Sequence, residues 1–172
     1  HDFGVAAMLH DIGKTLVPSH ILKKAGKLEP HEFEEMKKHP ISGSILLLRN
    51  PNLPKLASIV AYEHHIMLNG GGYPALHYNR ACTVASRLVH VCDVYDALCT
   101  DRPYRNAWSS TEALAYLEQR AGEEFDPDIV ATFARLLREG DLQVREFHEE
   151  THIIPAEGTP AAQAPSCCAH LP

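Results

Sequence analysis

The sequence predicts an all-α fold, a compact bundle of several helices. Apolar residues recur at three- to four-residue spacing along most of the chain. Prolines and glycines divide it into segments of helical length, and only residues 142–147 show a weak alternating pattern. The chain has 172 residues, of which 45% are hydrophobic and 22% charged, so it fits one ordinary globular domain.

Four helices are expected in the first part of the chain, each bounded by a proline or an acidic start. The first has ended by Val17 because Pro18 interrupts its pattern, and Pro30 opens a charged helix. The chain breaks again at Pro40 and at Pro51. The four helices are therefore predicted over residues 3–9, 31–38, 41–49 and 53–65.

A glycine-rich loop separates these helices from three longer ones. Residues 69–74 (NGGGYP) cannot form a regular element. Ser109 and Glu112 have the spacing of a capping box, and Pro127 suits a first helical turn that Gly140 later ends. Helices are predicted over residues 81–100 and 127–140, and a further helix starts at Ser109 and carries the apolar positions Ala113, Leu114 and Leu117. The inward residues expected on the first and last of them are Val84, Leu88, Val91, Val94 or Tyr95, Leu98, Ile129, Val130, Phe133, Leu136 and Leu137.

The chain divides into a domain of residues 1–141 and a C-terminal extension of residues 142–172. From about residue 149 the composition shifts to proline, alanine, glycine and serine, so the extension is expected to be largely flexible. Leu142 to Phe147 is the one weak candidate for a strand.

Charge and cysteine content exclude several classes of protein. A net charge of −6 argues against binding a nucleic-acid polymer. No apolar run reaches the ~18–20 residues of a membrane span, and no signal peptide is visible. The five cysteines contain no C-x-x-C pair. We therefore expect a cytoplasmic protein in a reducing compartment, with Cys82, Cys92 and Cys99 as small core residues.

Histidines and aspartates recur in a pattern typical of a metal site. They occur once per helix or helix end, about 25–29 residues apart, and successive helices of a bundle can direct such groups into one centre. Imidazoles with carboxylates suit iron, manganese or zinc, and the absence of thiolates argues against a purely structural zinc site. The candidate ligands are His10, Asp11, His39, His64, His65 and Asp93.

The adjacent pairs in this set favour two ions. Neighbours on a helix point about 100° apart, so His10 and Asp11 reach one cavity only by flanking two metals, or one metal near a helix end. Asp11 has two oxygens and is the natural bridge. Two ions about 3.5–4 Å apart cut phosphoesters with a water that loses its proton near neutral pH. The alternative for His64 and His65 is a helix C-cap.

Two further segments are candidates for binding a substrate. Gly70, Gly71 and Gly72 would let a backbone approach a ligand, and Tyr73 followed by Pro74 is a rigid aromatic surface for a base. The two arginines of residues 101–105 (DRPYR) could hold phosphate in a bidentate manner. The structural alternatives are a flexible turn and an exposed basic turn.

Five motifs in this order resemble the HD-GYP branch of the HD metal-dependent phosphohydrolases. They are HDIGK from residue 10, HPISG from 39, HH from 64 through NGGGYP from 69, DVYDAL from 93, and DRPYR from 101. The resemblance covers roughly residues 1–140. It implies an all-α HD-type bundle around two or three divalent ions, iron or manganese, that hydrolyses the bacterial second messenger cyclic di-GMP to pGpG or GMP.

The resemblance also implies roles for individual residues. Asp11 would bridge the ions and Lys14 would contact the scissile phosphate or assist the leaving oxygen. The metal ligands would be the six residues given above. The substrate-binding residues would be Lys14, Gly72, Tyr73, Pro74, Arg102 and Arg105. It implies an upstream receiver or sensor domain, and a homodimer is a further expectation.

Two positions depart from the family pattern, which leaves alternatives open. Ile66 and Asn69 stand where the family usually has Glu and Asp, and the family's first ligands lie on a helix upstream of this sequence. One metal position is therefore expected to lack a protein ligand. The alternatives are an HD phosphohydrolase acting on another cyclic dinucleotide or nucleotide, and a degenerate domain that binds cyclic di-GMP without hydrolysing it.

Overall fold

The computed structural model describes residues 1–75, 81–101 and 105–151, and side chains as far as residue 140. Within these ranges the chain is helical and has no β-strand, only isolated bridges such as that between Ile66 and Gly72. The all-α prediction is confirmed. In chain order the elements are α1 (Asp2–Leu9), the 3-10 helix η1 (Ile12–Leu16), α2 (Ser19–Leu22), α3 (Pro30–Met36), α4 (His39–Leu48), α5 (Lys55–Glu63), α6 (Val84–Cys99), α7 (Ser110–Gln119) and α8 (Pro127–Thr151).

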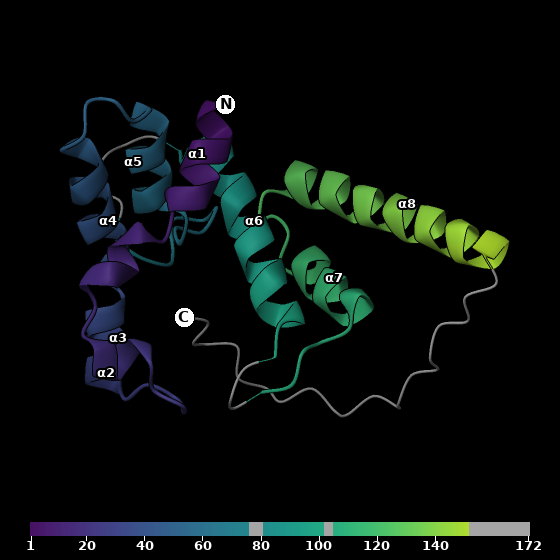
Figure 1. Cartoon of the computed structure of the whole chain (residues 1–172), viewed down its shortest axis with the longest axis horizontal. Helices are drawn as coiled ribbons and strands as arrows, with labels where there is room; N and C mark the ends of the chain where they lie inside the picture. Colours follow the sequence, from purple (N-terminus) through teal and green to yellow (C-terminus); the bar gives the residue numbers. More distant parts are fainter. Residues whose placement is uncertain (76–80, 102–104, 152–172) are drawn as a thin grey trace.

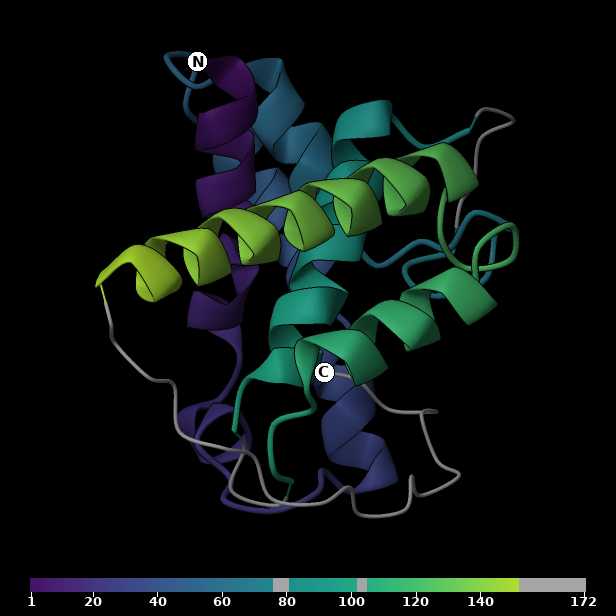
Figure 2. The same cartoon turned by 90° about the vertical axis from the view of Figure 1, so that its right-hand side faces the viewer.

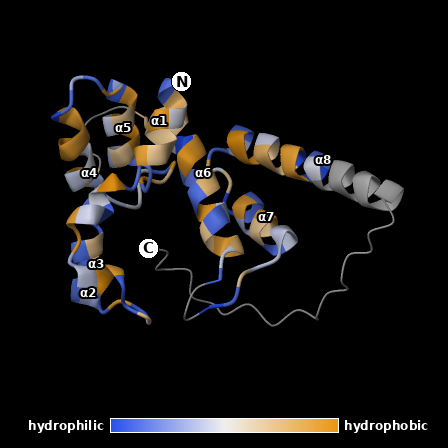
Figure 3. Ribbon diagram, viewed as in Figure 1, coloured by the Kyte–Doolittle hydropathy of each residue, from blue (hydrophilic) through white to orange (hydrophobic). Residues whose placement is uncertain are grey.

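Helix α6 lies between two groups of helices (Figure 1). On one side are α1, α4 and α5, and on the other are α7 and α8; in the turned view α8 crosses α6 (Figure 2). Each group has its own apolar core, and the hydrophobic residues line these contacts (Figure 3). Val89 of α6 belongs to the first core, with Ala6 and Val60, whereas Val91 and Leu98 belong to the second.

Local sequence signals account for most helix starts. Ser109 and Glu112 form the predicted capping box of α7, and Glu29 with Glu32 forms another at α3. The Thr83 hydroxyl accepts a hydrogen bond from the Ser86 amide at the start of α6. Helix α4 begins at His39, two residues before the predicted start, because a proline fits the first turn of a helix.

The predicted end of the last helix is wrong. Helix α8 continues through Gly140 to Thr151, and residues 142–147 are helical rather than extended. One glycine in a helix interior costs about 1 kcal/mol relative to alanine, which does not break a helix that good helix formers continue. The boundary at residue 141 therefore falls within α8, and residues 152–172 of the predicted flexible extension lie outside the described part of the chain.

Several predicted core positions are exposed. Val84 and Leu136 have exposed fractions of 61% and 54%, because Val84 is the first residue of its helix and Leu136 faces away from α6 and α7. Cys92 is also exposed, which contradicts its assignment to the core, and Cys82 and Cys99 are half-buried. None of the described helices combines the length and apolar character that crossing a membrane requires.

Candidate metal centre

The structure brings the six sequence-predicted side chains to one place, mostly from helix ends. His10 is the C-cap of α1, and Asp11 follows at the junction with η1. His39 is the first residue of α4, and His64 is the C-cap of α5. Helix ends let neighbouring side chains diverge from the helical spacing, so His10 and Asp11 both reach the centre. The remaining two residues are His65, directly after α5, and Asp93, within α6.

Two overlapping groups of ligand atoms can each hold an ion. Ligand atoms of Asp11 and the three histidines 39, 64 and 65 lie within 4.8 Å of one another, as do those of His10, Asp11 and Asp93. Asp11 belongs to both groups. Its Oδ1 is 3.2 Å from His39 Nε2 and 3.5 Å from His64 Nε2, and its Oδ2 is 3.5 Å from His10 Nε2. One carboxylate therefore has one oxygen directed at each group.

Backbone carbonyls orient three of the imidazoles. Nδ1–H of His10 donates to the Ala7 carbonyl at 2.7 Å, and Nδ1–H of His39 donates to Met36 at 2.8 Å. The same nitrogen of His64 is 3.0 Å from the Ala61 carbonyl. A carbonyl can only accept, so each Nδ1 carries a proton, and in the neutral form of each ring Nε2 presents a lone pair to the centre. A second partner of this kind is usual for histidines that bind metals.

Several polar atoms in the centre fit a bound cation. His39 and His64 are fully buried, and their Nε2 atoms face each other at 3.3 Å. Two neutral imidazoles with Nδ1 protonated would oppose two lone pairs there, which is unfavourable unless a cation lies between them. Nε2 of His10, Nε2 of His65 and Oδ1 of Asp11 are buried without a hydrogen bond. The donor set is one that binds iron, manganese or zinc.

The pKa values of the imidazoles differ across the centre. Burial lowers the pKa of His64 and, more strongly, that of His65, with neighbouring histidines adding to the effect on His65. Burial also acts to lower the pKa of His10, but hydrogen bonds with Asp11 and Asp93 outweigh it and raise this pKa to about 10. A cation bound beside His10 must therefore displace a proton, since only neutral imidazole is a ligand.

Both carboxylates of the centre are stabilised as anions. Burial acts to raise the pKa of Asp11, but hydrogen bonds from His10, His39 and His64 lower it far below its usual range. The pKa of Asp93 is also lowered, because its contact with His10, at 3.7 Å, outweighs burial. The centre thus offers two negative charges to a pair of dications.

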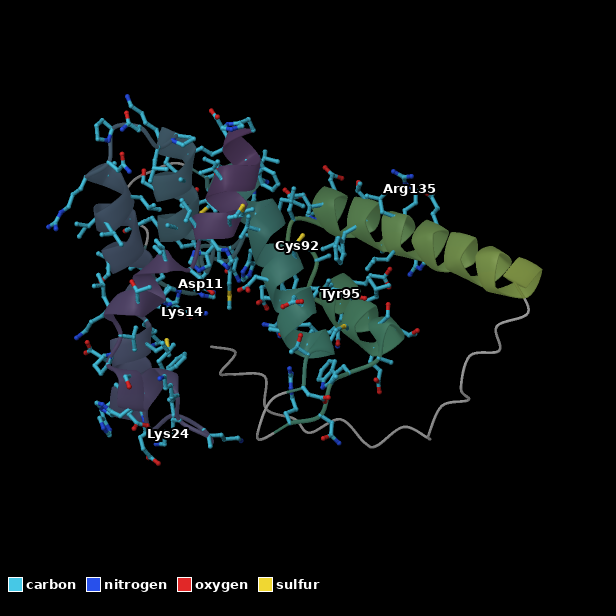
Figure 4. All side chains as sticks on the ribbon, viewed as in Figure 1. Asp11, Lys14, Lys24, Cys92, Tyr95 and Arg135 are labelled. Carbon is cyan, nitrogen blue, oxygen red and sulfur yellow. The ribbon has the colours of Figure 1, made fainter. Side chains whose placement is uncertain are left out.

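Lys14 and Tyr73 lie at the edge of this centre. Lys14 Nζ donates to Asp11 Oδ2 at 2.6 Å, and the two labelled residues lie close together just below α1, at η1 (Figure 4). The Tyr73 ring packs on His65 with centroids 4.6 Å apart, and its hydroxyl is buried without a hydrogen bond. Burial, followed by the charges of Asp11 and Asp93, raises the pKa of this hydroxyl, so it remains a hydrogen-bond donor.

The other predicted substrate residues are less directly placed. Gly72 has φ +80°, and a Cβ there would lie 2.1 Å from the His65 carbonyl oxygen. Glycine is therefore required where the loop passes the backbone of His65. Pro74 is buried next to Tyr73. The Arg105 guanidinium donates to the Ala97 carbonyl at the end of α6. Arg102 lies outside the described residues.

Three features of the centre were missed by sequence reasoning. Gly13 and Gly43 form a close crossing: a Cβ on Gly13 would lie 1.9 Å from the His39 carbonyl oxygen. Gly13 lies within HDIGK and Gly43 within HPISG, so the only signal in the sequence was a glycine a few residues after a ligand candidate in each motif. Glu63, adjacent to His64, is buried and accepts hydrogen bonds from the Thr83 amide and the Ser86 hydroxyl. It fixes the start of α6 against the end of α5.

An all-α domain in which one aspartate is shared between two groups of imidazole and carboxylate side chains can hold a pair of divalent ions. Residues 1–129 match the family model of the HD domain. The chain belongs to the HD domain family. The resemblance to HD phosphohydrolases drawn from the five sequence motifs is confirmed.

The chain is similar to curated bacterial phosphodiesterases. It is 41% identical over 132 residues to the cyclic di-GMP phosphodiesterase response regulator RpfG of Xanthomonas campestris, covering 76% of this chain and 35% of that protein. Identity to a cyclic di-GMP phosphodiesterase of Pseudomonas aeruginosa is 39% over 132 residues, covering 77% and 32%. A 3'3'-cGAMP-specific phosphodiesterase of Vibrio cholerae is 34% identical over 126 residues, covering 73% and 24%. The chain thus spans about a quarter to a third of the length of these relatives.

Proposed function

We propose that this chain is the catalytic domain of a phosphodiesterase of the HD-GYP branch that hydrolyses cyclic di-GMP to pGpG, GMP or both. The observation that carries the proposal is the pair of ligand groups sharing Asp11, with buried lone pairs that a cation would satisfy. Relatives named as cyclic di-GMP phosphodiesterases, at 38–41% identity, support the substrate.

Two divalent ions would occupy the two groups, with iron or manganese as the proposed metals. His39, His64 and His65 would hold one with Asp11, and His10 and Asp93 would hold the other with Asp11. Bound there, the ions supply an acidic water and stabilise negative charge on the phosphoryl oxygens. Imidazole and carboxylate ligands suit these metals.

The remaining side chains position the phosphodiester and move protons. Lys14 Nζ forms an ion pair with Asp11 Oδ2. From this position it would hold a phosphoryl oxygen or protonate the leaving oxygen. The Tyr73 hydroxyl, kept protonated by burial, would donate a hydrogen bond to the phosphate. Gly72 and Pro74 hold Tyr73 in place. Arg102 and Arg105 would bind the second phosphate of the cyclic dinucleotide.

A second candidate substrate is 3'3'-cGAMP. Relatives named as specific for it match this chain at 34–35% identity, only a few per cent below those named for cyclic di-GMP. Both substrates present the same phosphodiester to the centre and differ in one base. Loss of activity with retained binding is the remaining alternative, and the full set of six ligands argues against it.

The decisive experiment measures turnover of both cyclic dinucleotides by the protein loaded with iron or manganese. Product formation is followed by chromatography, with Asp11→Asn as the variant that disrupts both ligand groups. We expect pGpG or GMP from the parent protein and none from the variant. Binding of two ions per chain without turnover of either substrate would contradict the proposal.

Partners and location stay predictions. The relative named as a response regulator supports an upstream receiver domain. A homodimer stays a prediction. The free cysteines Cys92 and Cys99 support the proposal of a reducing, cytoplasmic location.

A further inference from the structure

A buried ion pair lies away from the metal centre and is not used by the chemistry proposed above. The Glu124 carboxylate, 7% exposed, lies in the turn between α7 and α8. Its Oε1 is 3.5 Å from His90 Nε2 on α6, and its Oε2 accepts a hydrogen bond from Arg120 Nε at the end of α7. These contacts outweigh burial and lower the pKa of Glu124. The carboxylate therefore ties the turn to two helices.

A second contact joins the same turn to α6. Arg87, one helical turn before His90, forms an ion pair with Asp126 at the start of α8. His90 is 5% exposed, and its ring packs on Phe125 with centroids 5.1 Å apart. Arg87 and His90 of α6 thus contact the segment between α7 and α8. Asp93, three residues after His90 on the same helix, belongs to the metal centre.

Backbone carbonyls of the same turn accept hydrogen bonds from the glycine-rich loop. The Leu68 amide donates to the Glu124 carbonyl and the Asn69 amide donates to the Glu123 carbonyl, each at 2.9 Å. These two hydrogen bonds connect the loop of residues 66–73 to a segment more than fifty residues away. The other end of the loop is fixed by the Tyr73 amide, which donates to the His65 carbonyl at 3.1 Å.

We propose that Glu124 is a positioning residue for the loop of residues 66–73. Its side chain fixes the turn to α6 and α7, the turn's carbonyls fix Leu68 and Asn69, and the loop then sets Tyr73 over His65. Without the carboxylate the turn loses its contacts with His90 and Arg120 and is held to α6 only by the Arg87–Asp126 ion pair and the packing of Phe125, so its carbonyls support Leu68 and Asn69 less firmly. The activity part of this inference depends on the proposed function; the structural part does not.

Hydrogen exchange tests the structural part directly. Glu124→Ala should raise the exchange rate of the Leu68 and Asn69 amides about tenfold, because the turn that accepts their hydrogen bonds loses its contacts with His90 and Arg120, while amides of α5 stay protected. The matched control is Glu123→Ala, because Glu123 supplies the same kind of backbone carbonyl from an exposed side chain. Glu124→Gln, which can still accept from Arg120 and donate to His90, should retain most of the protection.

Kinetics test the functional part. With metal content unchanged, Glu124→Ala should raise the KM for cyclic di-GMP severalfold, whereas the control Glu123→Ala should leave this KM unchanged. If Glu124→Ala does not fold, Arg120→Ala removes only one of the two attachments and should give a smaller increase in exchange at the same amides.

Two results would overturn the inference: wild-type exchange at Leu68 and Asn69 in a folded Glu124→Ala protein, or an equal rise in exchange throughout the chain. If the parent protein hydrolyses neither cyclic dinucleotide while the loop still responds to Glu124→Ala, the proposed function fails and the positioning role stands.

Discussion

Replacing Gly13 by alanine should separate the two halves of the metal centre. A Cβ at this position would lie 1.9 Å from the His39 carbonyl oxygen and 2.6 Å from the Gly43 amide nitrogen. Both neighbours are backbone atoms, so relief requires η1 and α4 to part by about 1.5 Å before an ordinary contact of 3.4 Å is reached. Asp11, two residues away, is now 3.2 Å from His39 Nε2 and would move with η1.

Metal sites tolerate ligand displacements of only about 0.2 Å, and a 1 Å misplacement of a catalytic group costs about a hundredfold in rate. We expect Gly13→Ala to lose most bound metal and at least a hundredfold in activity, and to lower the free energy of unfolding by about 1–3 kcal/mol. Metal content after gel filtration and thermal denaturation measure these effects. Gly4→Ala, where a Cβ meets nothing within 4 Å, is the control. Full metal content in a folded Gly13→Ala protein would refute the reasoning.

The remaining predictions concern individual ligands, a hydroxyl and pH. Asp93→Asn should leave one ion per chain, because the histidine-rich group with Asp11 stays intact, whereas Asp11→Asn should leave none; elemental analysis that found equal losses would contradict the shared carboxylate. Tyr73→Phe should reduce kcat about 10–100-fold at unchanged metal content, and unchanged kcat would exclude its hydroxyl from the reaction. Since the pKa of Glu124 lies below its ordinary 4.5, its ionised form stabilises the fold above that pH and this contribution disappears as the pH falls further. The melting temperatures of wild type and Glu124→Gln should therefore differ near neutral pH and converge in acid; a constant difference would show that the charge is not involved.

All the residues of the proposed metal centre except Asp93 stand in short motifs at helix boundaries, which is why they could be predicted. Pro40, for example, places His39 near a break in the chain, and helix ends are where adjacent side chains can share a site. The geometry at Asp11 could not be predicted, since it depends on the crossing of Gly13 and Gly43. That crossing joins segments thirty residues apart, and neither glycine alone indicates a contact.

Core membership was predicted less well than helix type. Val91 and Cys92 are both apolar neighbours on α6, yet one is fully buried and the other exposed, because consecutive residues point about 100° apart and only the packed helices decide which side is covered. Gly140 illustrates the same limit, because its effect depends on the residues that continue α8. The contact of His90 with Glu124 joins α6 to the turn between α7 and α8, and no local sequence pattern indicates this contact.

The position of α6 has a consequence for how the domain unfolds. Val89 packs in one apolar core and Val91 in the other, and Asp93 completes a ligand group whose other members come from the first half of the chain. Neither half therefore contains a whole metal centre, and neither buries its apolar surface without this helix. Bound ions would add their binding energy to the cohesion of both halves at once, so heat or denaturant should melt the loaded domain in a single cooperative transition rather than in two.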